Sequence, residues 1–387
     1  MKFSINSKEF KSLIERAAAV SLRDKKAIPA LTGLFIVADK DKQTVTVEAR
    51  NEKTYAEVHT ENAVILESGY VFAQTEDLKR LYNIPDDLTV ESQDGESLLV
   101  RGGKKQGEVA AQRDMERIAF PDNVENFAFT ADKEDVLDTL SRLSVCTECT
   151  DVKHVHRGYH IEDHAGLRIV TVNSHTAGIR ETEWNYSSGL DIVIPGWTNR
   201  ELKKVSDNKR QEKITVYSNS KFAKFTGTDY TYCTGLLDGE FLKIDRVIGF
   251  QNPTYRFDIS TEKLGAIAKE YKGFLLSSRY DKNPMFFCFR GDRLITAGES
   301  SSYRTTDVLD TDNEQDMPES LTYGINPALL EDVLSVFGKK EDITITGDRT
   351  SHITPWIISD ADGYKAVILP VRPLENMEGI YRLVDAA

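Results

Sequence analysis

The segment KFSINSKEFKSLI, residues 2–14, reads as a short strand that runs directly into a helix. Two later segments open in the same way, NFAFTADKEDVLDTL at 126–140 and RFDISTEKLGAIA at 256–268. In each, apolar and polar residues alternate, a capping signal with an acidic neighbour follows, and apolar residues then recur at helical spacing. Three copies at one long interval indicate repeated units of domain size.

A second set of segments keeps nearly the same interval. Each member reads as a helix, a polar break and a strand rich in β-branched residues, and the members lie at 72–90, 194–216 and 325–345. The strand markers of this set are Val90, Val216 and Ile345, and those of the first set are Phe3, Phe127 and Phe257. Since two separate elements keep one interval, the sequence predicts a threefold repeat.

Short alternating runs fill the sequence between these markers. Asp-Gly and Gly-Asp pairs, which are typical of hairpin turns, separate several of them. The combination predicts an α+β fold of three similar domains, each with two helices packed on antiparallel sheets. The predicted domains are 1–122, 123–252 and 253–374, followed by a C-terminal extension at 375–387.

The composition is that of a soluble globular protein. Of 387 residues, 40% are hydrophobic and 29% are charged, and no apolar run is long enough to cross a bilayer. The first residues lack the apolar core of a signal peptide, and the four cysteines are too few and too scattered for a disulfide scaffold. We therefore expect a cytoplasmic protein that does not bind membranes.

The net charge is −13, which by itself argues against binding to nucleic acid. The charges are segregated, however, because six segments expected to be helical carry about six more basic than acidic residues. These segments lie at 7–26, 76–82, 133–142, 199–213, 261–272 and 327–340. This pattern is typical either of lysine-rich solvated helices or of a basic helical surface that faces a polyanion.

Six short motifs resemble, in order and spacing, the bacterial beta sliding clamp family, the processivity rings of replicative DNA polymerases. They are MKFSI at 1–5, IPALTGLFIVAD at 28–39, LRIVTVNSH at 167–175, LLDGEFLKIDRVI at 236–248, YGINPALLEDVL at 323–334 and YKAVILPVRPL at 364–374. Each motif alone is weakly specific. Together with the threefold repeat they form a specific pattern, and the resemblance covers about residues 1–374.

The resemblance implies a head-to-tail homodimer that closes into a ring, with helices around a hole that holds duplex DNA. Such a ring contacts phosphates without reading base sequence, because base-specific contacts would hold it at one place. It also implies partners that bind a groove between domains two and three: the replicative DNA polymerase, the clamp loader and repair factors. The family has no catalysis of its own, so neither catalytic residues nor a cofactor are expected.

In the family, the last strand of the third domain lines an apolar groove that accepts partner peptides. A groove of this kind with Arg and His at its rim suits a peptide with hydrophobic anchors and a polar end. The matching positions here are His156, Ser174, His175, Thr176, Ala177, Leu242, Arg246, Val247, Asn326, Leu329, Val367, Ile368, Leu369, Pro370, Val371, Arg372 and Leu374. The alternative is that the last strand is ordinary core.

Several of these positions depart from the family pattern. The chain has Val-Asn-Ser-His-Thr-Ala at 172–177, where the family has Thr-Asp-Gly-His-Arg-Leu. Leu242 stands where proline is usual, His156 stands where leucine is usual, and Pro373 precedes the terminal leucine of the motif. After Leu374 the sequence continues past the point where family members end. We therefore expect an altered peptide preference, with the extension near the groove.

For contact with DNA, the resemblance implies basic residues after the first helix, on the rim of domain two, and on its basic helix or at the end of that helix. They are Lys25, Lys26, Lys153, Lys203, Lys204, Lys209 and Arg210. For ring closure it implies apolar residues of domain one against apolar residues of domain three in the partner subunit. These are Leu78, Leu81 and Tyr82 on one side and Phe274, Leu275 and Leu276 on the other. Sequence alone fits a solvated lysine or a core side chain at these positions equally well.

A cluster of cysteines and histidines gives an alternative function. Cys146 and Cys149, followed by His154 and His156, would make the ligand set of a zinc-dependent hydrolase or of a structural zinc site. Against this, the sequence has no HExxH motif and no second Cys-x2-Cys pair. A third possibility is a clamp-like paralogue that acts as a decoy or as a plasmid- or phage-borne replacement.

Overall fold

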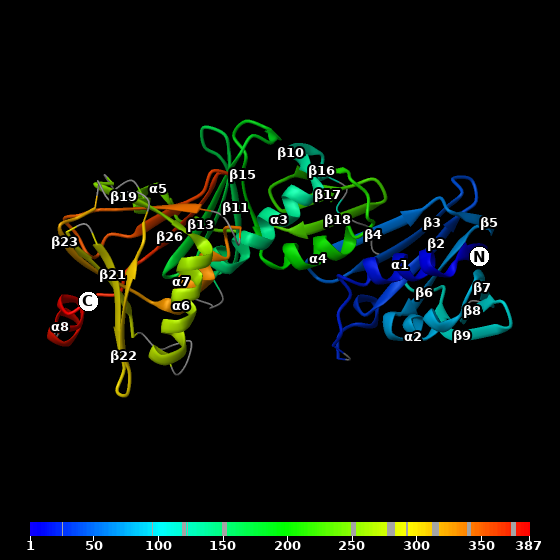
Figure 1. Ribbon diagram of the computed structural model, residues 1–387. Coiled ribbons are helices and arrows are strands. Elements are labelled where there is room, and N and C mark those ends of the chain that lie inside the picture. Colours follow the sequence, from blue (N-terminus) through cyan, green and yellow to red (C-terminus); the bar gives the residue numbers. More distant parts are fainter. Residues whose placement is uncertain are drawn as a thin grey trace. The chain divides into compact units, whose positions relative to one another are not determined.

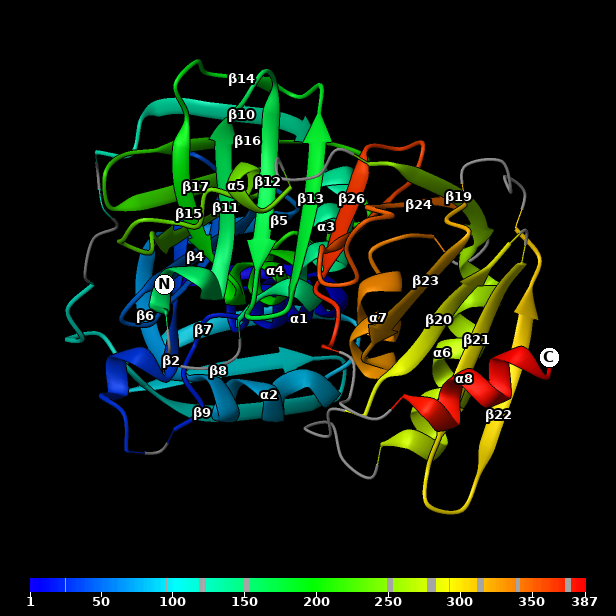
Figure 2. The same ribbon diagram turned by 90° about the vertical axis from the view of Figure 1, so that its left-hand side faces the viewer.

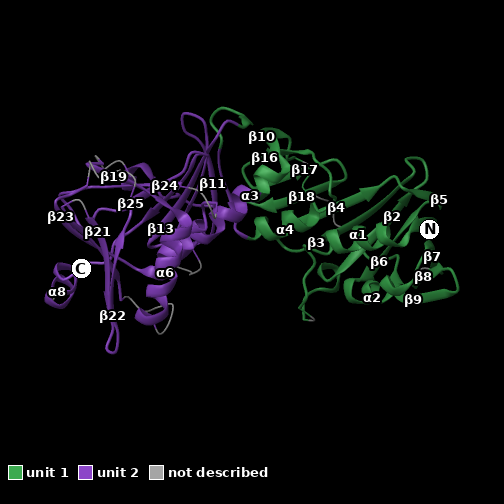
Figure 3. Ribbon diagram, viewed as in Figure 1, with its two compact units in different colours: residues 1–137, 184–190, 197–237 green, residues 138–183, 191–196, 238–387 purple. Residues whose placement is uncertain are grey.

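The structure is a computed structural model in which residues 1–24, 26–94, 96–117, 121, 123–148, 153–248, 253–276, 283–291, 293–311, 317–338, 342–372 and 377–387 are described. Figure 1 shows the chain coloured from the N-terminus to the C-terminus. It divides into two compact units (Figure 3): unit 1 holds residues 1–137, 184–190 and 197–237, and unit 2 holds 138–183, 191–196 and 238–387. Among the described helices, none has the length and apolar character needed to span a bilayer.

The elements fall into three successive groups. The first group is β1 (Lys2–Asn6), α1 (Ser7–Ala17), η1 (Pro29–Leu31), β2 (Gly33–Asp39), β3 (Thr44–Arg50), β4 (Thr54–Thr60), β5 (Ala63–Glu67), β6 (Gly69–Gln74), α2 (Thr75–Lys79), η2 (Arg80–Asn83), β7 (Asp87–Gln93), β8 (Ser97–Gly102) and β9 (Lys105–Gln112). The second is β10 (Asn126–Asp132), α3 (Lys133–Leu143), η3 (Ser144–Cys146), η4 (His154–Arg157), β11 (Gly158–Asp163), β12 (Leu167–Val172), β13 (Thr176–Thr182), β14 (Asn185–Tyr186), β15 (Asp191–Pro195), α4 (Trp197–Val205), β16 (Lys213–Ser218), β17 (Phe222–Thr226), β18 (Tyr230–Gly235) and α5 (Asp245–Ile248). The third is β19 (Tyr255–Ser260), α6 (Thr261–Leu275), β20 (Met285–Arg290), β21 (Arg293–Glu299), β22 (Arg304–Leu309), β23 (Ser320–Ile325), α7 (Pro327–Leu334), β24 (Asp342–Gly347), β25 (Trp356–Ser359), β26 (Tyr364–Ile368) and α8 (Glu378–Asp385).

The predicted threefold repeat is present as a repeated strand pair. In each group the first strand pairs antiparallel with the strand after the second helix: β1 with β7, β10 with β16, and β19 with β24. The sequence markers face one another across these pairs, for example Phe3 opposite Val90. In the second group a bulge shifts the register, so that Phe129 and not Phe127 lies opposite Val216.

Strand pairing also links one group to the next within each unit. In unit 1 a single sheet has the order β14-β10-β16-β17-β18-β4-β3-β2-β6-β9-β8-β7-β1-β5, in which β18 of the second group pairs with β4 of the first. In unit 2 a sheet has the order β15-β11-β12-β13-β26-β25-β24-β19, in which β26 of the third group pairs with β13 of the second (Figure 2). A further sheet of unit 2 has the order β22-β21-β20-β23.

The strand-to-helix junctions form for local reasons. Phe3, Phe129 and Phe257 of the first strands are at most 1% exposed, so each strand is fixed by burial, whereas Phe127 is half-buried. At the start of α1 the side chain of Asn6 accepts a hydrogen bond from the Lys8 amide at 3.0 Å, and at the start of α6 Ser260 accepts one from the Glu262 amide at 3.2 Å. These caps satisfy amides of the first helical turn, which have no partner inside the helix.

Several helices are shorter than the sequence predicted. α1 ends at Ala17 and not at residue 26, α4 ends at Val205 and not at residue 213, and α7 ends at Leu334 and not at residue 340. After α4 the backbone of Lys209 has a φ of 55°, which a right-handed helix does not contain. Lys209 and Arg210, which were expected on the basic helix or at its end, therefore lie in the loop after it.

A buried ion pair in unit 1 ties α1 to the end of α4. Arg16 donates to both carboxylate oxygens of Asp229 at 3.0 and 2.7 Å, and its Nε donates to the carbonyl of Val205 at 2.8 Å. The two charged side chains are only 7% and 12% exposed. Asn208 also donates to Asp229, at 2.8 Å, and Lys133 donates to Asn208 at 2.7 Å. Burial by itself would raise the pKa of Asp229, but the hydrogen bonds from Arg16 and Asn208 outweigh it and hold this pKa below its ordinary value.

We expect Asp229→Asn to destabilise the protein by about 3 kcal/mol at neutral pH, because it leaves the buried Arg16 without its counter-ion. Because the folded pKa is lowered, the wild-type contribution is present above the ordinary Asp pKa of about 3.9 and is lost as the pH falls through the folded value. Urea denaturation from neutral pH downwards measures both effects. The exposed Asp207→Asn is the matched control, and equal stability of the two variants would contradict the role of the pair.

Candidate functional site

The residues predicted to bind peptides all belong to unit 2. Four of them form the junction between β13 and β26 and are at most 6% exposed. They pair as Thr176 with Ile368 and Ala177 with Val367. These side chains therefore support the sheet and offer little surface to a partner.

The chain beyond β26 stays bound to its neighbours through the backbone and turns side chains outward. The amide of Leu369 donates to the carbonyl of His175 at 2.9 Å, and the amide of Val371 donates to the carbonyl of Gly324 at 2.7 Å. The Leu369 side chain is 36% exposed, and Arg372 is also exposed. We call residues 369–372 the C-terminal lip. A fixed backbone with outward apolar side chains is typical of a docking surface.

The other predicted residues divide by exposure. The exposed ones are Ser174, His175, Leu242 and Arg246, and the half-buried ones are His156, Val247, Leu329, Pro370 and Val371. Asn326 is 8% exposed and caps α7, since its side chain accepts hydrogen bonds from the Ala328 and Leu329 amides at 2.9 and 3.3 Å. The motif alone could not separate this capping role from a peptide contact. Leu374 lies outside the described residues.

The loop between β12 and β13 shows how the departure at 172–177 is accommodated. The Asn173 side chain accepts hydrogen bonds from the amides of His175 and Thr176, both at 2.8 Å, and so closes the turn without a glycine. The hydroxyl of Ser174 donates to the carboxylate of Glu148 at 3.1 Å. The carboxylate of Glu148 therefore lies beside Ser174. At position 176 this chain has threonine where the family pattern has arginine, so the charge of this surface differs from that pattern.

The segment before α5 is anchored by one aromatic side chain. The ring of Phe241, 7% exposed, lies 5.2 Å from that of His156 and 4.6 Å from that of His160, measured between centroids. Burial lowers the pKa of His156, and the charge of Lys153 lowers it further, so His156 is uncharged at neutral pH. Anchored in this way, the segment leaves the next residue, Leu242, 36% exposed.

Arg168 of β12 fastens α5 to the same sheet. Its guanidinium donates to the two carboxylate oxygens of Asp245 at 2.8 and 2.9 Å and to Glu162 at 2.8 Å, and its side chain is 3% exposed. Asp245 is the first residue of α5, which also carries Arg246 and Val247. The hydrogen bonds from Arg168 hold the pKa of Asp245 below its ordinary value. The sequence analysis missed this pair, although both residues lie in quoted motifs.

The zinc alternative gains no support within the described residues. They contain no group of three His, Cys, Asp or Glu side chains that could hold a metal ion, and Cys149 lies outside them. The Cys146 side chain is fully buried, and this burial raises the pKa of its thiol to about 12. His154 is exposed, and His156 packs on Phe241.

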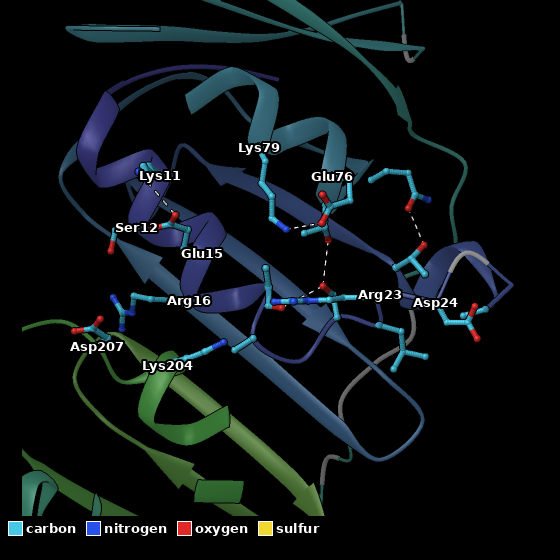
Figure 4. A pocket seen from close by; sticks show the side chains of 18 of the residues that line it. Lys11, Ser12, Glu15, Arg16, Arg23, Asp24, Glu76, Lys79, Lys204 and Asp207 are labelled. Atoms are coloured by element: carbon cyan, nitrogen blue, oxygen red, sulfur yellow. Dashed lines mark hydrogen bonds and ion pairs between the residues drawn. The ribbon is translucent and has the colours of Figure 1, made fainter. Parts of the chain in front are cut away.

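In unit 1 a cavity of about 770 Å³ lies between α1, the loop after it, α2 and α4 (Figure 4). Its basic lining residues are Lys8, Lys11, Arg16, Arg23, Lys79 and Lys204, and its acidic ones are Glu15, Asp24, Glu76 and Asp207. Lys79 is paired with Glu76, and Lys11 is 3.9 Å from Glu15. Of the residues predicted to contact DNA, Lys204 lines this cavity.

The other predicted DNA contacts are more scattered. Lys26, Lys203, Lys209 and Arg210 are exposed in unit 1, Lys153 is exposed in unit 2, and Lys25 lies outside the described residues. Lys8 and Lys11 of α1 also line the cavity and were not among the predicted residues; their three-residue spacing puts them on one helix face.

Most residues predicted at the ring joint are covered by their own unit. Leu78, Leu81 and Leu275 are at most 4% exposed, and Tyr82, Phe274 and Leu276 are half-buried. They support two sheet edges, however. A Cβ added to Gly107 of β9 would lie 2.9 Å from Leu81 Cδ2, and the ring of Phe274 lies 4.9 Å from that of Tyr303, next to β22.

The exposed apolar residues near these edges were not predicted. Tyr303 is 49% exposed and Val308 of β22 is 48% exposed. Alternation along the strand indicates only that one face is buried, so the sequence did not distinguish a solvent-facing valine from one that meets another chain.

Comparison with known proteins gives one consistent answer. The beta sliding clamp of Mycoplasma capricolum is 21% identical over 371 residues, covering 86% of this chain and 96% of that protein. The beta subunit of the Streptococcus pyogenes DNA polymerase matches with a TM-score of 0.86 at 18% identity, over 96% of this chain and 100% of that chain. The Pseudomonas aeruginosa sliding clamp bound to griselimycin matches with a TM-score of 0.83 at 15% identity, over 96% and 100%. No family model matches the sequence. The chain therefore has the DNA clamp fold.

We expect Asp245→Asn to loosen α5 while the rest of unit 2 stays folded, because Arg168 keeps Glu162 as a partner. The loss is expected to be about 1 kcal/mol, since Asp245 is half exposed and solvent screens the pair. Hydrogen exchange of the Arg246, Val247 and Ile248 amides measures it, because these amides bond within the α5 turn. The exposed Asp238→Asn in the same segment is the control. Unchanged exchange in Asp245→Asn would refute the fastening role.

Proposed function

We propose that the chain is a divergent member of the bacterial beta sliding clamp family and acts as a DNA sliding clamp. In this proposal two chains form a ring that encircles duplex DNA and tethers the replicative DNA polymerase for processive synthesis. Each chain would contribute three clamp domains, 1–122, 123–252 and 253–374. The protein would act in the cell interior without catalysis of its own, and its partners would carry out the chemical reactions.

The main support for a ring is one type of strand pairing between successive repeats. It occurs twice within the chain, whereas a closed cycle of repeats needs it after every third repeat as well. The last strand of the second group, β18, pairs with β4, the third strand after the helix in the first group. The last strand of the third group, β26, pairs with β13 at the same position in the second group. By the same rule β9, the last strand of the first group, should pair with β22 of a third group.

Both strands have an edge to offer. Among the described residues β22 pairs only with β21, and β9 pairs with β8 at residues 105–110 but with β6 only at Ala111 and Gln112. An exposed edge with apolar side chains is unfavourable unless another strand covers it. In a dimer, β22 of each copy can pair with β9 of the other copy. These two head-to-tail contacts close a ring when a two-fold rotation relates the copies.

The basic cavity of unit 1 supports contact with DNA. The lysines and arginines lining it come from α1, α2, α4 and the loop after α1, although the chain as a whole has a net charge of −13. Cations mixed with carboxylates favour loose contact with phosphates, which suits a protein that must slide.

Exposed residues of unit 2 support a site for partner peptides. The C-terminal lip and the segment around Leu242 are both attached to the sheet in which β11, β12, β13 and β26 follow one another. Phe241 packs on His160 of β11, Asp245 bonds to Arg168 of β12, and the lip continues β26. We propose that polymerase and clamp-loader peptides dock there. Griselimycin, bound in the Pseudomonas aeruginosa clamp structure, is a suitable small probe of this surface.

If β22 closes the ring, Val308→Asp should weaken dimerisation by about tenfold or more, because a carboxylate on the joining strand must be desolvated. Sedimentation over a concentration series measures this. Val64→Asp is a matched control, since Val64 is 60% exposed on β5, an edge strand that the repeat does not predict to pair. Equal dimerisation of both variants would argue against this joint.

If the basic cavity faces DNA, the triple variant Lys8→Glu, Lys11→Glu and Lys204→Glu should bind duplex DNA about tenfold more weakly at low salt. Its affinity should also depend less steeply on salt, because fewer phosphate contacts are made. The control carries the same charge change at the exposed Lys40, Lys42 and Lys104. Fluorescence anisotropy with labelled duplex DNA measures both. Equal loss in the two triple variants would show that only total charge matters.

A further inference from the structure

The C-terminal helix α8 covers one face of the sheet β22-β21-β20-β23. From the sheet, alternate residues of β20 and β21 contribute Phe286, Cys288, Ile295 and Ala297 to a buried cluster. From the helix and the residue before it, Met377, Ile380 and Val384 complete the cluster, and Leu383 packs against it. Figure 2 shows α8 lying across these strands. All these residues belong to unit 2.

The opposite face of this sheet is already covered by the core of the third group. Phe287 packs against Trp356 with centroids 4.7 Å apart, and Phe289 packs against Phe257 at 6.2 Å. Without α8, therefore, the sheet would have one buried face and one apolar face open to water. The helix supplies the second cover.

Polar contacts hold the far end of α8. The guanidinium of Arg290 lies 5.6 Å from the centre of the Tyr381 ring and 3.8 Å from the carboxylate of Asp385. Arg293 donates to the carbonyl of Ala387 at 3.3 Å. These contacts are exposed and individually weak, so the apolar cluster supplies most of the docking energy.

One strand position connects α8 to the C-terminal lip. Gly324 of β23 lies opposite Phe286 of β20, whose side chain is part of the cluster under α8. A Cβ on Gly324 would lie 3.0 Å from the carbonyl oxygen of Val371 and 3.4 Å from the ring of Phe286. Val371 forms an antiparallel bridge with Gly324, so the lip pairs with the edge of β23 that faces away from β20. Gly324 therefore lies between the lip and Phe286, which is part of the cluster under α8.

We propose that α8 is a positioning element for the peptide site: by packing on Phe286 it holds the C-terminal lip in its binding conformation. This inference rests on the proposed function for the use of the lip, but the packing itself does not. The lip has two backbone hydrogen bonds, from Leu369 and Val371. Met377, buried at 7% exposure, belongs to the cluster under α8. A lip whose backbone is already fixed loses less entropy when a peptide binds than a free end does.

The test compares Ile380→Asp with Tyr381→Asp in the full-length protein. Ile380 is 5% exposed and Tyr381 is 40% exposed, so only the first variant places a charge in the cluster, while the helix propensity of the new residue is the same. Thiol labelling of Cys288, fully buried beneath α8 and identified by mass spectrometry, reports whether the helix has undocked. If Ile380→Asp does not fold, Val384→Ala gives a milder opening of the same cluster.

Two readouts are then taken on the undocked variant. Hydrogen exchange of the Leu369 and Val371 amides should accelerate by about tenfold or more, and labelled griselimycin should bind about fivefold more weakly or worse, with Tyr381→Asp near wild type in both. Undocking with unchanged exchange at Leu369 and Val371 would overturn the proposal. Faster exchange with unchanged griselimycin affinity would overturn the link to peptide binding. If the wild-type protein bound neither griselimycin nor polymerase peptides, the proposed peptide site would fail, and the exchange measurement would still decide whether α8 holds the lip.

Discussion

The backbone ladder between the last strand of one repeat and the third strand of the repeat before it is the interaction on which the rest of the structure depends. It occurs as β18 on β4 and as β26 on β13, each time over five residue pairs. Backbone pairing of this kind is indifferent to side chains, so it persists while the repeats diverge in sequence. It also makes the repeats asymmetric. In every repeat the last strand can pair with the preceding repeat, and the third strand after the first helix can pair with the following one. In a chain of three repeats one edge of each kind is left over, and this remainder is the reason why we propose a head-to-tail ring.

The same ladder builds the surface that we propose for partners. Because β26 joins β13, the chain after β26 runs beside the β12–β13 loop, and the Leu369 amide bonds to His175. Phe241 and Asp245, which anchor α5 and the segment before it, contact β11 and β12 of that sheet. Departures from the family pattern are matched by local replacements, as when Asn173 closes a turn that otherwise uses glycine. The altered loop and the added helix α8 therefore modify a site whose framework is set by strand pairing.

The sequence predicted what depends on local periodicity. Alternation and helical spacing, repeated three times, were enough for the fold class and for the repeat markers, of which Phe3 and Val90 lie opposite one another in the structure. It failed where tertiary contact decides. The bulge that selects Phe129 over Phe127, and the loop conformation at Lys209 beyond the end of α4, leave no clear local pattern. Ion pairs such as Arg168 with Asp245, 77 residues apart, become visible only when the sheet brings them together. Leu78 and Leu81 show a second limit of prediction from sequence. An apolar residue that lies beneath an interface has the same sequence pattern as one that lies within it.

The central claim is that two chains close into a ring through β9 and β22. Small-angle X-ray scattering with absolute mass, recorded over a concentration series, tests it most directly. We predict the mass of two chains, with the scattering profile of a hollow disc that persists on dilution into the micromolar range. A compact particle with the mass of one chain at the highest concentration would contradict the account, because the unpaired edges would then have no partner.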